Sequence, residues 1–136
     1  MTMLDRASAR PISFAFWPPT LAVFAAFAFS GVAMALGFAP MIEGMAHLGY
    51  PDYFPPLLAA WKIAGAIVLI APSLPLLKEW AYAGIMFDLS GAIVSRISVG
   101  DYGFDLILPM VLTVLTTASW LLRPDSRRLA GTRVTL

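Results

Sequence analysis

Long apolar stretches alternate with short polar ones along this chain. Four stretches are long enough for helices, which the pattern places at about residues 19–39, 54–71, 79–99 and 104–122. Each is close to the ~20 residues that a helix needs to cross a bilayer. Glycine, proline and aspartate gather between them, where helices end and turns form. The pattern predicts an all-α integral membrane protein, a four-helix bundle of antiparallel, up-down helices.

Prolines mark the ends of the predicted helices. Pro18 and Pro19 suit the first turn of the first helix, because proline has a helical φ and that turn needs no N–H partner. Pro72 and Pro75 end the second helix, and the short connection makes the third an antiparallel neighbour. We therefore expect a cytoplasmic segment over 1–16, a single domain over 17–122 and a disordered cytoplasmic tail over 123–136.

The composition supports lipid as the solvent of these helices. Apolar residues fill 60% and charged residues 12% of the 136 positions, with a mean hydropathy of +0.81. Soluble domains average about 45–50% apolar and about 25% charged residues. A net charge of +1 offers no basic surface for nucleic acid, and the lack of cysteine excludes thiolate metal sites and disulfides.

The charged residues between the predicted helices differ in sign at the two ends of the bundle. One end holds Arg6, Arg10, Lys78, Arg123, Arg127, Arg128 and Arg133. The opposite loops hold Glu43, His47, Asp52, Asp101 and Asp105. Because arginine and lysine favour the cytoplasmic side, we expect both termini there, in a bacterial inner membrane.

Lys62 and Asp88 are charges inside predicted spans. Small residues share the helix face of each, which directs both side chains into the bundle. From the helical rise, Lys62 lies about 13 Å and Asp88 about 20 Å from the outer ends of their helices, a difference that a lysine side chain can span. An unpaired charge at the bilayer centre costs at least about 2.5 kcal/mol, so we predict an ion pair between them.

Arg96 completes a predicted polar pocket in the outer half of the bundle. It lies about 7 Å from the outer turn and could reach Glu43 or Asp101. Lys62, Asp88 and Arg96 are the candidate catalytic residues, because buried ionisable groups suit acid–base work. The candidate ligand-binding residues are Glu43, His47, Ser95 and Asp101. The alternative is that Lys62 and Asp88 form a structural pair that sets helix register.

His47 and the Lys78-Glu79-Trp80 segment have simpler interpretations. One histidine and one carboxylate leave most metal coordination unfilled, so we predict no metal site and favour a solvated loop histidine. The same count argues against a haem with two histidine ligands from this chain, and no cofactor is assigned. Lys78-Glu79-Trp80 fits the cytoplasmic boundary, where tryptophan anchors and charges cap a helix.

Several motifs resemble the DoxX-like membrane proteins. The matching segments are Leu48-Gly49-Tyr50-Pro51, Trp61-Lys62-Ile63-Ala64-Gly65-Ala66, Leu77-Lys78-Glu79-Trp80-Ala81-Tyr82-Ala83-Gly84, Phe87-Asp88, Gly91-Ala92, Ser95 and Gly100-Asp101. They extend over about residues 42–122, and the resemblance implies a four-helix membrane bundle. The family often has Ser-His where this chain has Ser95-Arg96, so a role that needs an imidazole there is not expected.

Two classes of function remain open. Relatives are linked to thiosulfate–quinone oxidation, to a membrane oxidoreductase complex and to receptor assembly. The resemblance therefore implies either a membrane enzyme or subunit that holds a small apolar or quinone-like ligand in the outer pocket, or an accessory protein without chemistry. The accessory protein would bind a membrane-protein partner, or a second copy of itself, through faces of small residues. We favour the ligand-binding class.

Overall fold

The computed structural model describes residues 3–130, with side chains over residues 14–130. Five α-helices follow one another, and no strand occurs among these residues. The helices are α1 Met3–Ala35, α2 Ala39–His47, α3 Phe54–Ile70, α4 Pro75–Val99 and α5 Phe104–Leu121, followed by a short 3-10 helix, η1, over Asp125–Arg127. The predicted all-α class is confirmed.

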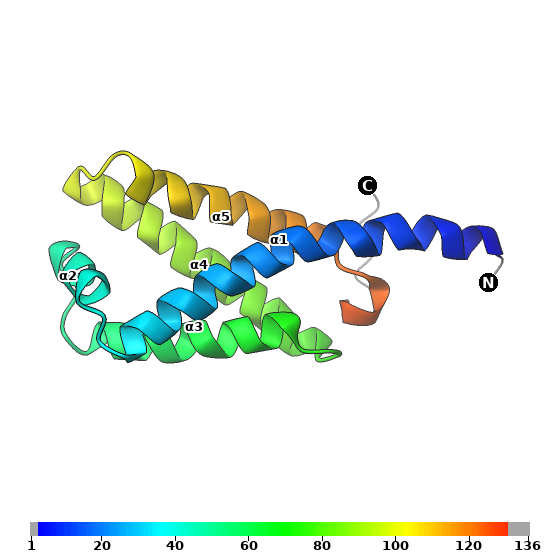
Figure 1. Cartoon of the computed structure of the whole chain (residues 1–136), viewed down its shortest axis with the longest axis horizontal. Coiled ribbons are helices and arrows are strands. Elements are labelled where there is room, and N and C mark those ends of the chain that lie inside the picture. Colours follow the sequence, from blue (N-terminus) through cyan, green and yellow to red (C-terminus); the bar gives the residue numbers. More distant parts are fainter. Residues whose placement is uncertain (1–2, 131–136) are drawn as a thin grey trace.

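The four long helices surround a shared apolar core. α1 packs against α3 and α5, and α4 packs against the same two helices (Figure 1). The buried core cluster consists of Val23, Phe27, Ala66, Leu69, Tyr82, Ile85 and Leu89. Gly31 lets α1 and α3 approach closely, because a Cβ added there would stand 2.9 Å from Ile63 Cγ1. The start of α1, the α3–α4 turn and the C-terminal segment lie at one end, which we call the inner end; α2 and the α4–α5 turn lie at the other, the outer end (Figure 1).

The first helix begins earlier than the prolines suggested. α1 starts at Met3 and continues through Pro18 and Pro19 to Ala35. Each proline removes its own N–H bond, here to the carbonyls of Phe14 and Ala15, and crowds that carbonyl, but its φ stays helical. The predicted helix start after Trp17 is therefore wrong, since prolines compatible with a first turn do not require one.

The region around Glu43 and His47 is a helix, α2, where the sequence suggested a loop. Pro40 lies in its first turn, where the missing N–H costs nothing. Met45 is buried against Met34 and the small side chain of Ala59. This tertiary contact supports a nine-residue helix, which would be too short to be stable alone.

Two helices are long and apolar enough to cross a membrane, namely the Phe14–Ala35 part of α1 and α5 over Phe104–Leu121. Only 28% and 17% of these two segments is buried inside the protein, so most of their apolar surface faces outward. α3 is apolar too, but has 17 residues. Large side chains such as Trp61 and Phe87 are also exposed. Apolar surface of this extent suits lipid and not water.

Candidate functional site

A nearly buried ion pair, which we call the deep pair, joins α3 and α4 between the two ends. Lys62 Nζ donates to Asp88 Oδ2 at 2.8 Å, and the two side chains are only 12% and 17% exposed. The ammonium also lies over the Phe27 ring of α1, 4.3 Å from its centroid. The predicted pairing of these two residues is confirmed, and three helices supply its surroundings.

Nearer the outer end, Asp101 accepts hydrogen bonds from two helices. His47 Nε2 of α2 lies 3.1 Å from Asp101 Oδ2, and Arg96 Nη1 of α4 donates to the same oxygen at 3.0 Å. The hydrogen bond from His47 and then that from Arg96 hold the pKa of Asp101 below its usual range. The side chains of Arg96, Asp101 and His47 are 22%, 27% and 57% exposed. Of the two partners predicted for Arg96, Asp101 is confirmed.

A separate contact holds Ser95. Tyr50, from the loop after α2, shares a 2.6 Å hydrogen bond between its hydroxyl and Ser95 Oγ, and its ring stacks on Phe54 at 4.5 Å. Ser95 is seven residues from Asp88, about 10 Å along α4. Glu43 is exposed on α2, and no hydrogen bond or ion pair within the described part of the chain joins it to the other candidates. The sequence did not select Tyr50 as a site residue.

The inner end contains a lysine that the sequence placed at the boundary without a partner. Lys78 is 1% exposed, and its ammonium donates to the carbonyls of Val68 at 2.6 Å, of Leu69 at 3.3 Å and of Ala71. These carbonyls end α3 and lack partners within that helix. Burial, and then the positive charges of Arg127 and Arg123, lower the pKa of Lys78 to about 8.

Arg123 joins α4 to the end of α5. It is 2% exposed, and its Nη2 lies 2.7 Å from Glu79 Oε1. Trp120 Nε1 donates to the other carboxylate oxygen of Glu79 at 3.0 Å. The guanidinium also lies over the Tyr82 ring at 5.0 Å, and its Nη1 has no hydrogen-bond partner among the described residues.

The C-terminal segment that was predicted to be disordered folds back onto the helices as far as residue 130. Arg127 Nη1 approaches the carbonyls of Leu69 and Ala71 at 3.4 and 3.2 Å. Its guanidinium lies over the Trp17 ring at 4.9 Å. The prediction is wrong for this part of the tail, because arginines that look like a topology signal in the sequence find helix-end carbonyls and aromatic rings in the tertiary structure.

A chain of hydroxyl groups lies beside Arg123 and includes the hydroxyl of Tyr82, whose ring its guanidinium covers. Ser119 Oγ lies 2.7 Å from the Tyr82 hydroxyl and 2.6 Å from Thr20 Oγ1. Thr20 in turn donates to the Phe16 carbonyl at 2.5 Å. These hydrogen bonds join α1, α4 and α5 inside an apolar core, where an unsatisfied hydroxyl would be costly.

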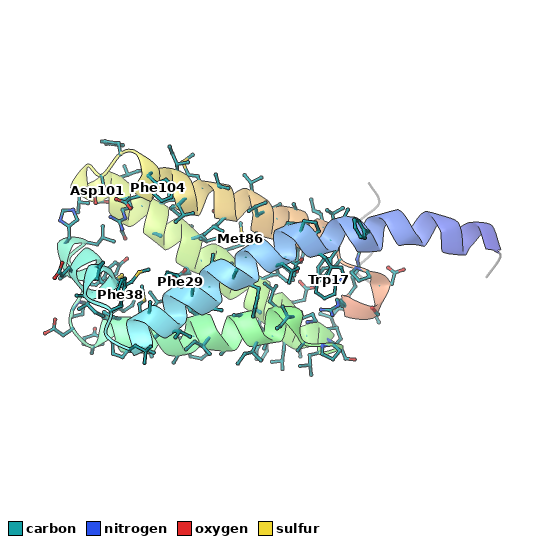
Figure 2. All side chains as sticks on the ribbon, viewed as in Figure 1. Trp17, Phe29, Phe38, Met86, Asp101 and Phe104 are labelled. Atoms are coloured by element: carbon teal, nitrogen blue, oxygen red, sulfur yellow. The ribbon has the colours of Figure 1, made fainter. Side chains whose placement is uncertain are left out.

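Two of the surface hollows among the described residues are lined by none of the predicted site residues. One, of about 300 Å³, lies between α4 and α5 and is lined by Glu79, Tyr82, Ala83, Met86, Thr116, Thr117 and Trp120. The other, of about 410 Å³, is lined by Phe29, Val32, Ala33, Leu36 and Phe38. Figure 2 shows Phe29 and Phe38 toward the end that holds Asp101, with Trp17 toward the other end.

The sequence identified the deep pair and the residues of the outer contacts, but missed the buried contacts of Lys78 and Arg123 at the inner end. Their signal was available in Lys78-Glu79 and the arginines after residue 122, which share one side of the bundle in a four-span arrangement. No group of three or more histidine, cysteine, aspartate or glutamate side chains that could hold a metal occurs within the described residues.

Outward-facing apolar helices with charges paired between them define a helical membrane protein. A family model described as the DoxX-like family matches residues 19–119 of the chain. The chain therefore belongs to the DoxX-like family, which confirms the resemblance carried by its motifs. Curated proteins and solved structures give no match.

Proposed function

We propose that the protein crosses a bacterial inner membrane four times, with α1, α3, α4 and α5 as an antiparallel bundle and both termini in the cytoplasm. The inner end carries Lys78, Arg123 and Arg127, whereas the outer end carries Asp101 and Asp105 with Arg96. The positive-inside rule supports this orientation.

We further propose that the outer half binds a small amphiphilic ligand with an apolar body and a polar ring head, such as a quinone. The observation that carries this proposal is the Lys62–Asp88 pair, 2.8 Å apart and nearly buried between apolar helices. Charges in such a place default to function, because lipid makes them costly. Lys62 would donate a hydrogen bond to a ligand oxygen, and Asp88 would accept a proton.

The outer contacts would form the rim of the same site. Arg96, Asp101 and His47 link α2 to the α4–α5 turn, and the Tyr50–Ser95 hydrogen bond lies on the same side. Glu43 would lie at the entrance, from its exposed place on α2. Ionisable side chains at this depth could bind the polar head while the ligand body stays in lipid.

Absorption spectra and mass spectra of the detergent-purified protein test this function. We expect the wild-type protein to carry a bound organic ligand. The Lys62→Met, Asp88→Leu double variant should fold and lose it, because the polar pair is replaced by apolar side chains of similar size. Equal ligand content in both proteins would contradict the proposed site.

A second candidate is an accessory protein that binds another membrane protein through α4. A Cβ at Gly84 or Gly91 would meet no atom within 4 Å, so this face of α4 is unoccupied, and Phe87 beside it is 77% exposed. Faces of small residues allow close helix contact in lipid. This function needs no ligand, so a protein that purifies without one but with a membrane partner would favour it.

Two glycine variants separate packing inside the chain from packing against a partner. Gly31→Ala should destabilise the protein by about 1 kcal/mol, because the added Cβ meets Ile63. Gly84→Ala should leave the isolated protein as stable or slightly more stable, since alanine favours helices. If Gly84→Ala also leaves copurification of a partner unchanged, the accessory function through this face is refuted.

A further inference from the structure

Three cationic side chains converge on one place at the inner end. Lys78 and Arg127 both approach the carbonyls of Leu69 and Ala71, at the C-terminus of α3. Arg123 lies over the ring of Tyr82, which follows Lys78 by one helical turn on the same face of α4. We call Lys78, Arg123 and Arg127 the inner cation cluster.

The inner cation cluster has too little negative charge around it. Within the described residues, Glu79 is the one carboxylate in contact with it, through Arg123. The C-termini of α3 and of α5, whose Trp120 carbonyl accepts a hydrogen bond from Arg123 Nε, each contribute roughly half a negative charge. Three cations therefore face about two negative charges, so positive charge remains in a place largely shielded from water.

The cluster also contains an unused hydrogen-bond donor. Arg123 Nη1 is buried without a hydrogen-bond partner in the described part of the chain, which is rare for a charged group. Arg127 is the member of the cluster that an anion can reach from the protein surface. Arg127 is only partly buried, and its contacts to the carbonyls, at 3.2 to 3.5 Å, are long for hydrogen bonds.

Tryptophans place the cluster at the level of lipid head groups. Arg127 lies over the Trp17 ring and Arg123 over the Trp120 ring, while Trp80, two residues after Lys78, is exposed. Tryptophan side chains concentrate at the boundary between hydrocarbon and head groups. Phosphate groups of lipids are abundant at this depth, and arginine binds phosphate with two parallel hydrogen bonds.

We propose that the inner cation cluster binds the phosphate head group of an anionic phospholipid. Arg127 holds the phosphate at the protein surface, and Arg123 and Lys78 supply charge behind it. A zwitterionic lipid is a poorer ligand, because its own ammonium group offsets the phosphate. This site is separate from the proposed outer pocket and does not depend on it.

Thermal unfolding of the full-length protein in dodecyl maltoside tests the proposal. The additives are dihexanoyl phosphatidylglycerol, dihexanoyl phosphatidylcholine and sodium phosphate at equal concentrations. We expect phosphatidylglycerol at saturation to raise the unfolding midpoint by about 5 °C, and the other two to raise it far less. An equal rise with phosphatidylcholine would overturn the proposal, and an equal rise with sodium phosphate would assign the site to a free anion.

Two variants separate the cluster from the general charge of the tail. Arg127→Gln should lose most of the phosphatidylglycerol effect. Arg128→Gln removes the same charge from a guanidinium that donates to the carbonyls of Arg123 and Leu121, and it should keep the effect. Equal losses in both variants would show unspecific attraction and overturn the proposal.

Lipid retention by the wild-type protein tests the site if Arg127→Gln does not fold. The wild-type protein should retain at least threefold more phosphatidylglycerol than phosphatidylcholine from a 1:1 mixture. Equal retention of the two lipids would refute the site.

Discussion

The two ends of the molecule use similar charged side chains in different surroundings. At the inner end, Lys78 and Arg123 are nearly inaccessible to solvent and bind backbone carbonyls, a carboxylate and aromatic rings. At the outer end, Arg96 and His47 bind Asp101 where part of each side chain remains exposed. Burial, more than the number of ion pairs, decides how much a charge affects stability.

The turns at the two ends of the molecule differ in backbone strain. Ser73 and Leu74 both have positive φ, of 60° and 57°, a conformation that costs about 1–2 kcal/mol per non-glycine residue. Lys78 and Arg127 bind the carbonyl of Ala71, directly before this turn. The outer turn instead ends α4 with Gly100, which adopts its φ of 78° without that cost. Hydrogen bonds from inner-end side chains therefore hold the residue before a strained turn, whereas the outer turn uses a glycine.

The largest effect should follow the loss of Arg123. Arg123→Gln leaves the Glu79 carboxylate without its ion pair beside an apolar core, and we expect a loss of about 3 kcal/mol in the free energy of unfolding. Chemical or thermal unfolding in detergent measures it. Arg128→Gln, which removes the same charge from the same tail, should cost about 1 kcal/mol. Equal losses would mean that burial does not distinguish these arginines.

The second-largest loss of stability should follow the loss of Lys62 from the deep pair. Lys62→Met leaves Asp88 unpaired among apolar side chains and should cost about 2 kcal/mol. Adding Asp88→Leu should recover stability to within about 1 kcal/mol, because no unpaired charge remains. Unfolding of the three proteins under one set of conditions measures this cycle. A double variant less stable than Lys62→Met would contradict the simple pairing.

The titration of Lys78 tests the burial of the inner end directly. The chain has two lysines, so NMR of ¹³C-lysine-labelled protein gives two assignable side-chain signals. Lys78 should titrate with a pKa of about 8. Since the unfolded chain keeps this proton up to about pH 10.5, stability should rise as the pH rises from about 8 to about 10.5. Arg127→Gln should raise the pKa of Lys78, and an unchanged value would contradict their proximity.

The smallest effect should follow the loss of Asp101. Asp101→Asn weakens contacts to two partly exposed partners, so the unfolding midpoint should fall less than in Lys62→Met. The difference from wild type should vanish in 1 M NaCl, where the Debye length is about 3 Å. Because the pKa of Asp101 is lowered, its contribution is present above pH of about 4 and is lost as the pH falls through the lowered pKa. A larger fall in the unfolding midpoint than that of Lys62→Met would show that the outer contacts stabilise the protein more than the Lys62–Asp88 pair does.

Much of the fold was predictable, because apolar runs and turn residues act locally along the chain. The predicted helices at 54–71, 79–99 and 104–122 correspond to α3, α4 and α5, although α4 begins four residues earlier, at Pro75. The early start of α1 and the helix α2 were missed. Prolines in the first turn of a helix and within a helix look alike in a sequence, and α2 depends on its contacts with Met34 and Ala59.

Some contacts of the candidate site were predictable from the sequence and others were not. The pairing of Lys62 with Asp88 was predictable from the sequence. An unpaired charge in lipid is costly, and the helical rise gives the depth of each side chain in the bundle. Arg96 had two possible partners, and only the position of the α4–α5 turn selected Asp101 over Glu43. The sequence offered no reason to join Tyr50 to Ser95, since 45 residues separate them.

The membrane environment, the order of the helices and the family follow from the amino-acid sequence, because these depend on composition, hydropathy and local motifs. Which charges are buried, and what they bind, became evident from the packing of the helices. The arginines of the tail look like a topology signal in the sequence. In the folded protein Arg123 contacts Glu79 and Arg127 contacts the end of α3, where they form the inner cation cluster with Lys78. The reason is physical: the energy of a charge depends on its solvent and its neighbours, and both are set by helices far apart in the chain.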